Sequence, residues 1–198
     1  MALTKQAKTL NKNQIGAVLN YLEGRRNNLR NRTIFLLSVR AGLRAKEIAY
    51  LRWDMLLDVD GALSTEMALH NEASKGQSGR RIPLSKELRA SLSELLDLRQ
   101  QDRGFSPSEH VIRTERTDRT SPQAIVNMFA SWYLDLGLLG CSSHSGRRTF
   151  ITNAAKKITD VGGSLRDVQY LAGHSSLQTT ERYIDYSEKA RRSIVDAI

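Results

Sequence analysis

The sequence predicts a mainly α-helical domain with a small antiparallel β-sheet, an α+β fold. Apolar residues recur at intervals of three and four along most of the chain, which is the period of an amphipathic helix. Only residues 55–84 depart from this period, with two short β-like runs around a glycine-containing turn. A chain of 198 residues, 40% apolar and 26% charged, is typical of a globular domain with a buried core.

The first helices are marked by their caps. Residues 1–10 are polar and basic, and we expect them to form a flexible tail. Asn11 or Asn13 then caps a helix that ends at Gly24, because Ile, Val and Leu follow at helical spacing. A second helix is predicted over residues 28–42, and its apolar residues on most sides place it at the centre of the core.

Residues 43–53 are predicted to form a short helix with a cation at the start of its apolar face. Arg44 shares this face with Glu47, Ile48 and Leu51. A half-buried guanidinium needs an anion, because an unpaired buried charge is costly. One interpretation is an internal Arg44–Glu47 ion pair. The other keeps Glu47 as a support while Arg44 binds the phosphate of a ligand.

The β-like region predicts a hairpin. Residues 66–69 and 81–84 are the expected strands, and the segment 72–79 between them contains two glycines. Lys75 therefore lies at a mobile tip. A lysine in such a place is usually a solubility residue, and the alternative is a mobile general acid that reaches a site from above.

Two further helices have clear N-terminal signals. Ser85 caps the first, and Ser121-Pro122 begins the second with proline at the first helical position. Residues 111–112 between them are expected to be a short strand or an apolar plug. The second helix carries an apolar stripe that we expect in the core, formed by Ile125, Phe129, Trp132 and Tyr133.

The helix that begins after His144 places Arg147 in its first turn, on the same side as Phe150 and the buried stripe. The helix dipole disfavours a cation there by about 0.3–1 kcal/mol, whereas an anion would meet free N–H groups. This favours an anion site made by Arg147 and His144. The alternative is a salt bridge from Arg147 to a carboxylate elsewhere.

The C-terminal part predicts three more segments. Ser164 caps a helix that ends at Gly173. Another helix is expected to start at residue 175 or 176 and to contain Tyr183. Residues 187–198 have amphipathic spacing and are expected to form a helical tail that packs on its own domain or on a neighbouring subunit.

The net charge of +9, from 30 Lys and Arg against 21 Asp and Glu, suggests a polyanionic partner such as nucleic acid. A basic but ordinary enzyme is the alternative. Clustered arginines are candidate DNA contacts, although any one such cluster is more often a solvated surface than a binding site. The candidates are Arg80, Arg81, Arg113, Arg116, Arg119 and Arg148.

Other classes are disfavoured by composition. The single cysteine, Cys141, allows neither an intramolecular disulfide nor a Cys-rich zinc site. No apolar run approaches the roughly 20 residues that a membrane span needs, and the N-terminus lacks a secretory core. We therefore expect no membrane association and a location in the bacterial cytoplasm or nucleoid.

The candidate catalytic residues, in chain order, are Arg44, Lys75, His144, Arg147, His174 and Tyr183. No carboxylate cluster suited to Mg²⁺, no Walker-type loop and no zinc-ligand spacing accompanies them, so neither a metal nor another cofactor is expected. Phosphoryl transfer without a metal needs a nucleophile, cations for the non-bridging oxygens and a proton donor for the leaving oxygen. This set of side chains supplies all three.

Three motifs resemble those of the tyrosine recombinases, also called phage-type integrases: AGLRAKEI (41–48), HSGRRTF (144–150) and LAGHSSLQTTERY (171–183). Lys75 falls on the hairpin where the family keeps its lysine. The resemblance covers residues 11–186 and implies the DNA breaking-rejoining fold of the family's catalytic domain.

The resemblance also implies a chemistry. Tyr183 would attack a DNA phosphodiester and form a 3′-phosphotyrosyl link, while Arg44 and Arg147 hold the phosphate. The covalent link conserves the energy of the broken bond, so neither ATP nor a metal is required. Tyr186, three residues further on, is the competing nucleophile, and the spacing from His174 favours Tyr183.

The remaining roles come from the same resemblance. Lys75 would protonate the 5′-oxygen, His144 and His174 would assist at the phosphate and at Tyr183, and Glu47 would support Arg44. The implied partners are double-stranded DNA, further copies of the chain in a tetramer on DNA, and an accessory DNA-bending protein. The alternatives are a catalytically idle DNA-binding relative and a type IB topoisomerase-like enzyme.

Two departures from the family pattern concern single residues. Arg148 stands where many relatives carry a second histidine, and Gly146 stands where they often carry leucine. A third concerns length, because fewer than about 45 residues precede Arg44, where most relatives have a separate helical domain. We therefore expect a minimal single-domain member of the family, encoded by a mobile genetic element.

Overall fold

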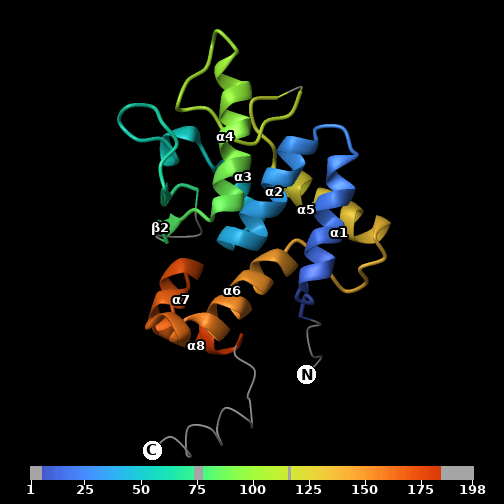
Figure 1. Ribbon diagram of the computed structural model, residues 1–198, viewed down its shortest axis with the longest axis vertical. Helices are drawn as coiled ribbons and strands as arrows, with labels where there is room; N and C mark the ends of the chain where they lie inside the picture. Colours follow the sequence, from blue (N-terminus) through green and yellow to red (C-terminus); the bar gives the residue numbers. More distant parts are fainter. Residues whose placement is uncertain (1–5, 74–77, 116, 184–198) are drawn as a thin grey trace, which may run out of the picture.

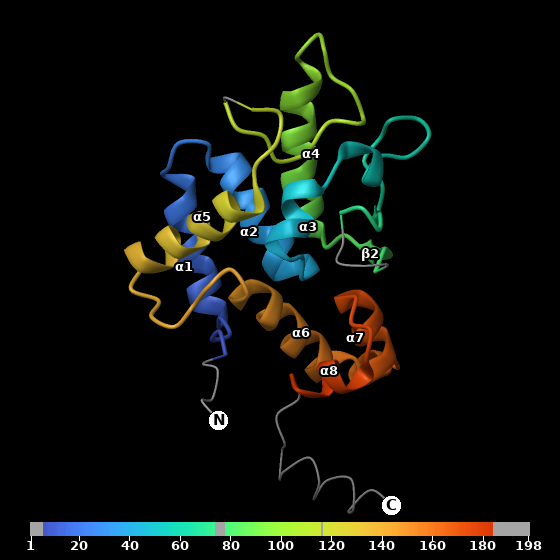
Figure 2. The same ribbon diagram turned by 180° about the vertical axis from the view of Figure 1, so that it is seen from behind.

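A central helix, α2, organises the larger part of the molecule (Figure 1). The computed structural model describes residues 6–73, 78–115 and 117–183. Figures 1 and 2 show α1 and α5 on one side of α2 and α4 on the other. The helices are α1 (Lys12–Glu23), α2 (Asn28–Ala41), α3 (Ala45–Tyr50), α4 (Lys86–Gln100), α5 (Pro122–Asp135), α6 (Ser145–Lys157), α7 (Leu165–Ala172) and α8 (Leu177–Glu181). The predicted fold class, mainly α with a small antiparallel sheet, is confirmed.

The helix caps lie where the sequence predicts them. Asn11 caps α1 in a reciprocal capping box. The Asn11 side chain accepts the backbone N–H of Gln14, and the Gln14 side chain accepts the backbone N–H of Asn11. Ser85 and Ser121 cap α4 and α5, and Ser164 accepts and donates in a box with Asp167 at the start of α7. These caps fix the helix starts independently of tertiary packing.

The main core lies around α2, whose residues from Ile34 to Leu37 are fully buried. The predicted stripe of α5 packs here, and the rings of Phe35 and Phe129 lie 6.5 Å apart. Val111 is also buried in this core and donates its N–H to the carbonyl of Leu51 at 2.8 Å. Residues 111–112 are therefore an apolar plug between elements rather than a strand.

The sheet is a two-stranded antiparallel hairpin of β1 (Glu66–Leu69) and β2 (Arg80–Pro83). Glu66 pairs with Pro83, and Leu69 pairs with Arg80. The sequence predicted the second strand over residues 81–84, but the strand begins one residue earlier. Arg80 therefore belongs to the ladder. Because strand side chains alternate, Arg80 and the buried Ile82 point to the same, inner face.

A second, smaller core joins the C-terminal helices. Ile151 of α6 and Val168 and Ala172 of α7 are buried together, and Tyr183 packs at the edge of this cluster. Figure 1 shows α6 leaving the main core and ending beside α7 and α8. The functional side chains lie where these two cores meet.

Residues 6–10 differ from the expected flexible tail. Lys8 donates its backbone N–H to the carbonyl of Gly140, and Leu10 donates to Thr149 Oγ1 at 2.7 Å. The Leu10 side chain joins the main core. This part of the predicted tail is therefore fixed against the start of α6.

Several predictions fall outside the described residues: those on Lys75, Arg116, Tyr186 and residues 187–198. The short 3₁₀ turns η1 (Trp53–Met55) and η2 (Thr159–Val161) complete the described elements. Among the helices in the described ranges, none is long and apolar enough to cross a membrane.

Candidate active site

Five of the predicted site residues come together where α3, α6, α7 and the segment after α8 meet. Arg44 and Glu47 lie at the start of α3, Arg147 lies in α6, and His174 and Tyr183 flank α8. His144, the residue before α6, lies at one edge of the same region. Segments separated by more than a hundred residues thus build one site.

Arg44 is the N-cap of α3, and Glu47 is bound to it twice. The Arg44 backbone N–H donates to Glu47 Oε2, and its Nη1 donates to Oε1, both at 2.8 Å. Glu47 is fully buried, whereas the Arg44 side chain keeps 25% of its surface exposed. The internal ion pair is therefore present, and the rest of the guanidinium lines a cavity of about 840 Å³ together with Gly173 and His174.

Arg80 completes the environment of Glu47, although the sequence placed it among the candidate DNA contacts. Its side chain is 2% exposed, and its Nη1 and Nη2 lie 3.1 and 3.3 Å from the two oxygens of Glu47. Its Nε donates to the carbonyl of Leu171 at 2.8 Å. The available signal was strand alternation, because Arg80 stands two residues before the apolar Ile82.

Arg147 is buried, as its place on the inner face of α6 predicted, and its hydrogen-bond partners in the protein are two backbone carbonyls. Nη1 donates to the carbonyl of Gly42, and Nη2 donates to the carbonyl of Ala172, both at 2.6 Å. These carbonyls end α2 and α7, where the helix dipole presents partial negative charge. The alternative interpretation, a salt bridge from Arg147 to a carboxylate, is therefore not what the structure shows, because the guanidinium binds two helix C-termini.

The pKa of Arg147 reflects this setting. Burial and, after it, the nearby charge of Arg44 lower this pKa to about 10, while the charge of Glu47 acts in the opposite sense. Arg147 therefore remains protonated at neutral pH. The carbonyl groups that bind the guanidinium are neutral, so they do not cancel its positive charge.

His174 is held in its neutral form. Burial, followed by the charges of Arg147 and Arg44, lowers its pKa to about 4. Its Nδ1 lies 2.9 Å from the hydroxyl of Thr180, a fully buried side chain that sequence reasoning did not single out. This bond orients the ring and leaves Nε2 for another partner.

Tyr183 lies two residues beyond the end of α8, not inside a helix as expected. Its ring stacks on His174 with the centroids 5.6 Å apart. It also lines a second cavity, of about 360 Å³, together with His144, Arg147 and Arg148. The Arg148 guanidinium lies 6.0 Å from the centre of the Tyr183 ring, and its Nη1 donates to the carbonyl of Ala7.

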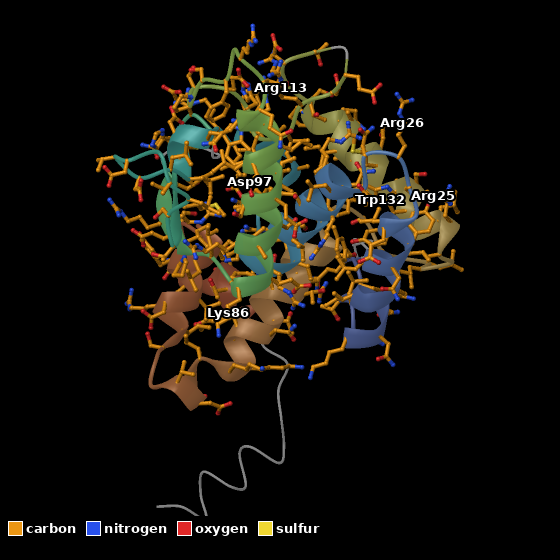
Figure 3. All side chains as sticks on the ribbon, turned by 45° about the horizontal axis from the view of Figure 1, so that its top comes forward. Arg25, Arg26, Lys86, Asp97, Arg113 and Trp132 are labelled. Carbon is orange, nitrogen blue, oxygen red and sulfur yellow. The ribbon has the colours of Figure 1, made fainter. Side chains whose placement is uncertain are left out.

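Among the described residues, three further candidate DNA contacts, Arg81, Arg113 and Arg119, do not join this site. Arg113 bridges Glu109 and Asp118, and Figure 3 shows it at the end of α4 remote from Lys86. Arg81 is exposed and pairs with Glu66 of the facing strand. Arg119 is exposed, with its guanidinium 5.8 Å from the centre of the Tyr50 ring.

The charge balance of the site favours an anionic ligand. The site holds the guanidinium groups of Arg44, Arg80 and Arg147 but one carboxylate, that of Glu47, which Arg44 and Arg80 bind directly. His174 is neutral. Three positive charges against one leave an excess of two among these residues. A phosphate beside Tyr183 would offset this excess and accept the donors that Arg44 and His174 still offer.

Comparisons with known proteins agree with this arrangement. Residues 8–190 match the family model described as the phage integrase family. The chain is 28% identical over 169 residues to tyrosine recombinase XerA of Pyrococcus horikoshii, a match that covers 85% of this chain and 55% of that protein. It is 32% identical over 162 residues to XerA of Thermococcus onnurineus, covering 78% and 50% respectively.

A solved structure shares the fold. The Tn1549 transposon integrase in complex with a circular intermediate DNA superimposes with a TM-score of 0.76 and 18% identity, over 99% of this chain and 67% of that one. The chain spans about half the length of the curated relatives that it matches. Because the family model matches residues 8–190, which is most of the chain, the chain belongs to the phage integrase family, the tyrosine recombinases.

Proposed function

We propose that this chain carries the catalytic domain of a site-specific DNA recombinase that cleaves and rejoins strands through a 3′-phosphotyrosyl intermediate. The observation that carries the proposal is the position of Tyr183 beside His174 and Arg147, next to an excess of positive charge that only partly reaches solvent. The similarity to tyrosine recombinases of Pyrococcus horikoshii and Thermococcus onnurineus supports the same reaction.

In this mechanism Tyr183 is the nucleophile. Its phenolic oxygen bonds to phosphorus as the bond from phosphorus to the 5′-oxygen breaks. The phenol loses one proton and the 5′-oxygen gains one, so the step is balanced without a cofactor. Attack by a 5′-hydroxyl of another strand reverses the step and joins the strands, and the phosphotyrosyl bond supplies the energy.

The arginines stabilise the charge that develops on the phosphate. Arg44 offers the exposed part of its guanidinium, and Arg147 offers an uncompensated charge behind it. Because both groups are already held by protein acceptors, they need little reorganisation when the transition state forms. We assign the two arginines to the non-bridging oxygens.

The proton transfers fall to the histidines and the lysine. His174, neutral at physiological pH, can accept a proton or donate a hydrogen bond through Nε2. His144 lines the same cavity as Tyr183, and we assign it assistance with proton transfer at Tyr183 and the phosphate. Lys75, on the segment between β1 and β2, is assigned the protonation of the 5′-oxygen on the family resemblance.

The substrate is proposed to be double-stranded DNA, with strand exchange carried out by a tetramer of this chain, alone or with an accessory DNA-bending protein. The Tn1549 integrase structure contains DNA, which supports the first part of this proposal. Arg119, Arg81 and Arg148 are the described candidates for contacts to the DNA backbone. Arg113, held by two carboxylates, is the weakest candidate.

Covalent trapping tests the function. The protein is incubated with a pool of nicked duplexes that tile the DNA around its gene, so that the 5′-hydroxyl fragment diffuses away after cleavage. We expect a protein–DNA adduct that survives SDS, and we expect EDTA to leave its yield unchanged. DNA binding without an adduct on any duplex would contradict the proposal and favour an idle DNA-binding relative.

A further inference from the structure

Arg80 joins three elements that carry the site. Its guanidinium forms two hydrogen bonds to Glu47 of α3, one to the Leu171 carbonyl in the last turn of α7, and one to the Ser78 carbonyl beside its own strand. A buried charge is costly unless its donors are satisfied. These bonds therefore fix the distance between the hairpin, α3 and α7.

Glu47 is shared between two arginines. Its Oε1 accepts from Nη1 of Arg44 at 2.8 Å and from Nη1 of Arg80 at 3.1 Å. Burial raises the pKa of this carboxyl, but the hydrogen bonds and charge of Arg80, followed by those of Arg44, outweigh burial and hold the pKa below its usual value. Without Arg80, less would offset the effect of burial on the pKa of Glu47, and the carboxyl would protonate at higher pH.

The contact with α7 reaches His174. Leu171 lies three residues before His174, and Gly173 between them turns the chain with a positive φ of 60°. A Cβ at Gly173 would lie 2.7 Å from Arg80 Nη1, so the guanidinium packs directly beneath this turn. The neighbouring Arg81 N–H donates to the Tyr170 hydroxyl at 3.1 Å, which adds a second tie between β2 and α7.

We propose that Arg80 is a positioning residue of the cleavage site, which acts through Glu47 on Arg44 and through the end of α7 on His174, and that it does not contact DNA. The inference rests on the proposed cleavage reaction. It assigns one of the six candidate DNA-binding arginines to the interior of the site.

Substitution separates positioning from DNA contact. In Arg80→Met we expect the single-turnover rate of adduct formation to fall about a hundredfold, because a misplacement near 1 Å has an effect of that order. DNA affinity and its salt dependence should stay as in the wild type, whereas loss of a phosphate contact would reduce the salt slope by about one. Arg99→Met is the matched control, because Arg99 also pairs with a carboxylate, Glu109 at 2.9 Å, but at the far end of α4.

The pH profile identifies the route through Glu47. We expect the acidic limb of the rate profile to move to higher pH in Arg80→Met, and Arg80→Lys to restore part of the rate. In a Glu47→Gln background, Arg80→Met should cause a smaller further loss than it does in the wild type, because the route through Glu47 is already broken and only the contact with α7 remains to be lost. Fully multiplicative losses, or an Arg80→Met enzyme with wild-type rate and profile, would overturn the proposal.

A readout without DNA keeps this test separate from the function itself. Carboxyl-carbon NMR titration of Glu47 should give a pKa below that of an exposed glutamate in the wild type and a raised pKa in Arg80→Lys, the variant with the milder change. An unchanged titration would contradict the route through Glu47 even if every variant folds. A wild-type protein that titrates as expected but forms no adduct would instead contradict the proposed function.

Discussion

Arg147 is bound by groups that carry no net charge. Its two terminal nitrogens donate to the carbonyls of Gly42 and Ala172, at the ends of two helices. A carboxylate in their place would bind the guanidinium more strongly but would also cancel its charge. Carbonyl acceptors hold the side chain in place and leave the charge for a phosphate. Because every residue has a carbonyl, the sequence offers no sign of such partners.

His174 gives the site a measurable pH signature. Its pKa is about 4 in the folded protein, against about 6.5 for an ordinary histidine. As the pH falls from 6.5 towards 4, the unfolded chain binds a proton that the folded chain does not, so stability is lost across this window. We predict that the free energy of unfolding of His174→Gln, measured with urea across this window, falls less steeply with decreasing pH than that of the wild type.

The control for this prediction is His70→Gln, which removes an exposed histidine just after β1. Equal slopes for the wild type and His174→Gln would show that His174 does not resist protonation in the folded protein.

At the scale of elements, the end of α7 depends on a glycine. Gly173 has φ of +60°, and a methyl group there would press on Arg80. Gly162 has φ of +75°, but a methyl group added there would meet no atom within 4 Å. Both Ala substitutions should carry the strain of a positive φ, about 1–2 kcal/mol. Only Gly173→Ala should also displace Arg80 and reduce adduct formation.

Thermal unfolding and the covalent assay on the two variants decide this point. We expect Gly162→Ala to lower stability while it forms adduct at the wild-type rate. A Gly173→Ala protein that is no more impaired than Gly162→Ala would mean that Arg80 adapts to the added methyl group.

The contact between α2 and α6 explains a departure from the family pattern. A Cβ at Gly146 would lie 2.4 Å from Ser38 Oγ and 2.9 Å from Ser38 Cβ, so the helices meet too closely for a larger residue. We predict that Gly146→Ala destabilises the protein by about 1–3 kcal/mol, the usual range for overpacking. Adding Ser38→Gly should recover part of that loss, because it removes both atoms.

The matched control is Gly16→Ala in α1, where nothing lies within 4 Å of the added group. Replacing a helical glycine by alanine in open space should stabilise by about 0.5–1 kcal/mol. Chemical unfolding of the three variants gives the comparison, and a neutral Gly146→Ala would show that α6 can shift away from α2.

For the whole molecule, the sequence predicted the helices better than the contacts between them. Caps and apolar spacing are local, so Asn11, Ser85, Ser121 and Ser164 marked their helices correctly. The inward face of Arg147 also followed from helical spacing. The role of Arg80 and the hydrogen bond between Thr180 and His174 depend on how distant elements pack. A single sequence gives only weak evidence of such packing.

The net charge of +9 predicts salt-sensitive DNA binding. Log affinity should fall linearly with log salt concentration as counterions are released. Arg119→Gln should reduce this slope by about one if the exposed guanidinium contacts a phosphate. Arg113→Gln should leave it unchanged, because Glu109 and Asp118 already hold that side chain. Binding measured over a salt series tests both, and an equal effect of the two changes would contradict the assignment.

The identity of the residue joined to DNA tests the central claim most directly. Trypsin should release residues 183–189 from the adduct, and this peptide contains both Tyr183 and Tyr186. We predict that fragmentation by tandem mass spectrometry places the nucleotide on Tyr183, that Tyr183→Phe forms no adduct while it still binds DNA, and that Tyr186→Phe still forms one. A nucleotide on Tyr186, or an adduct that persists in Tyr183→Phe, would contradict the account.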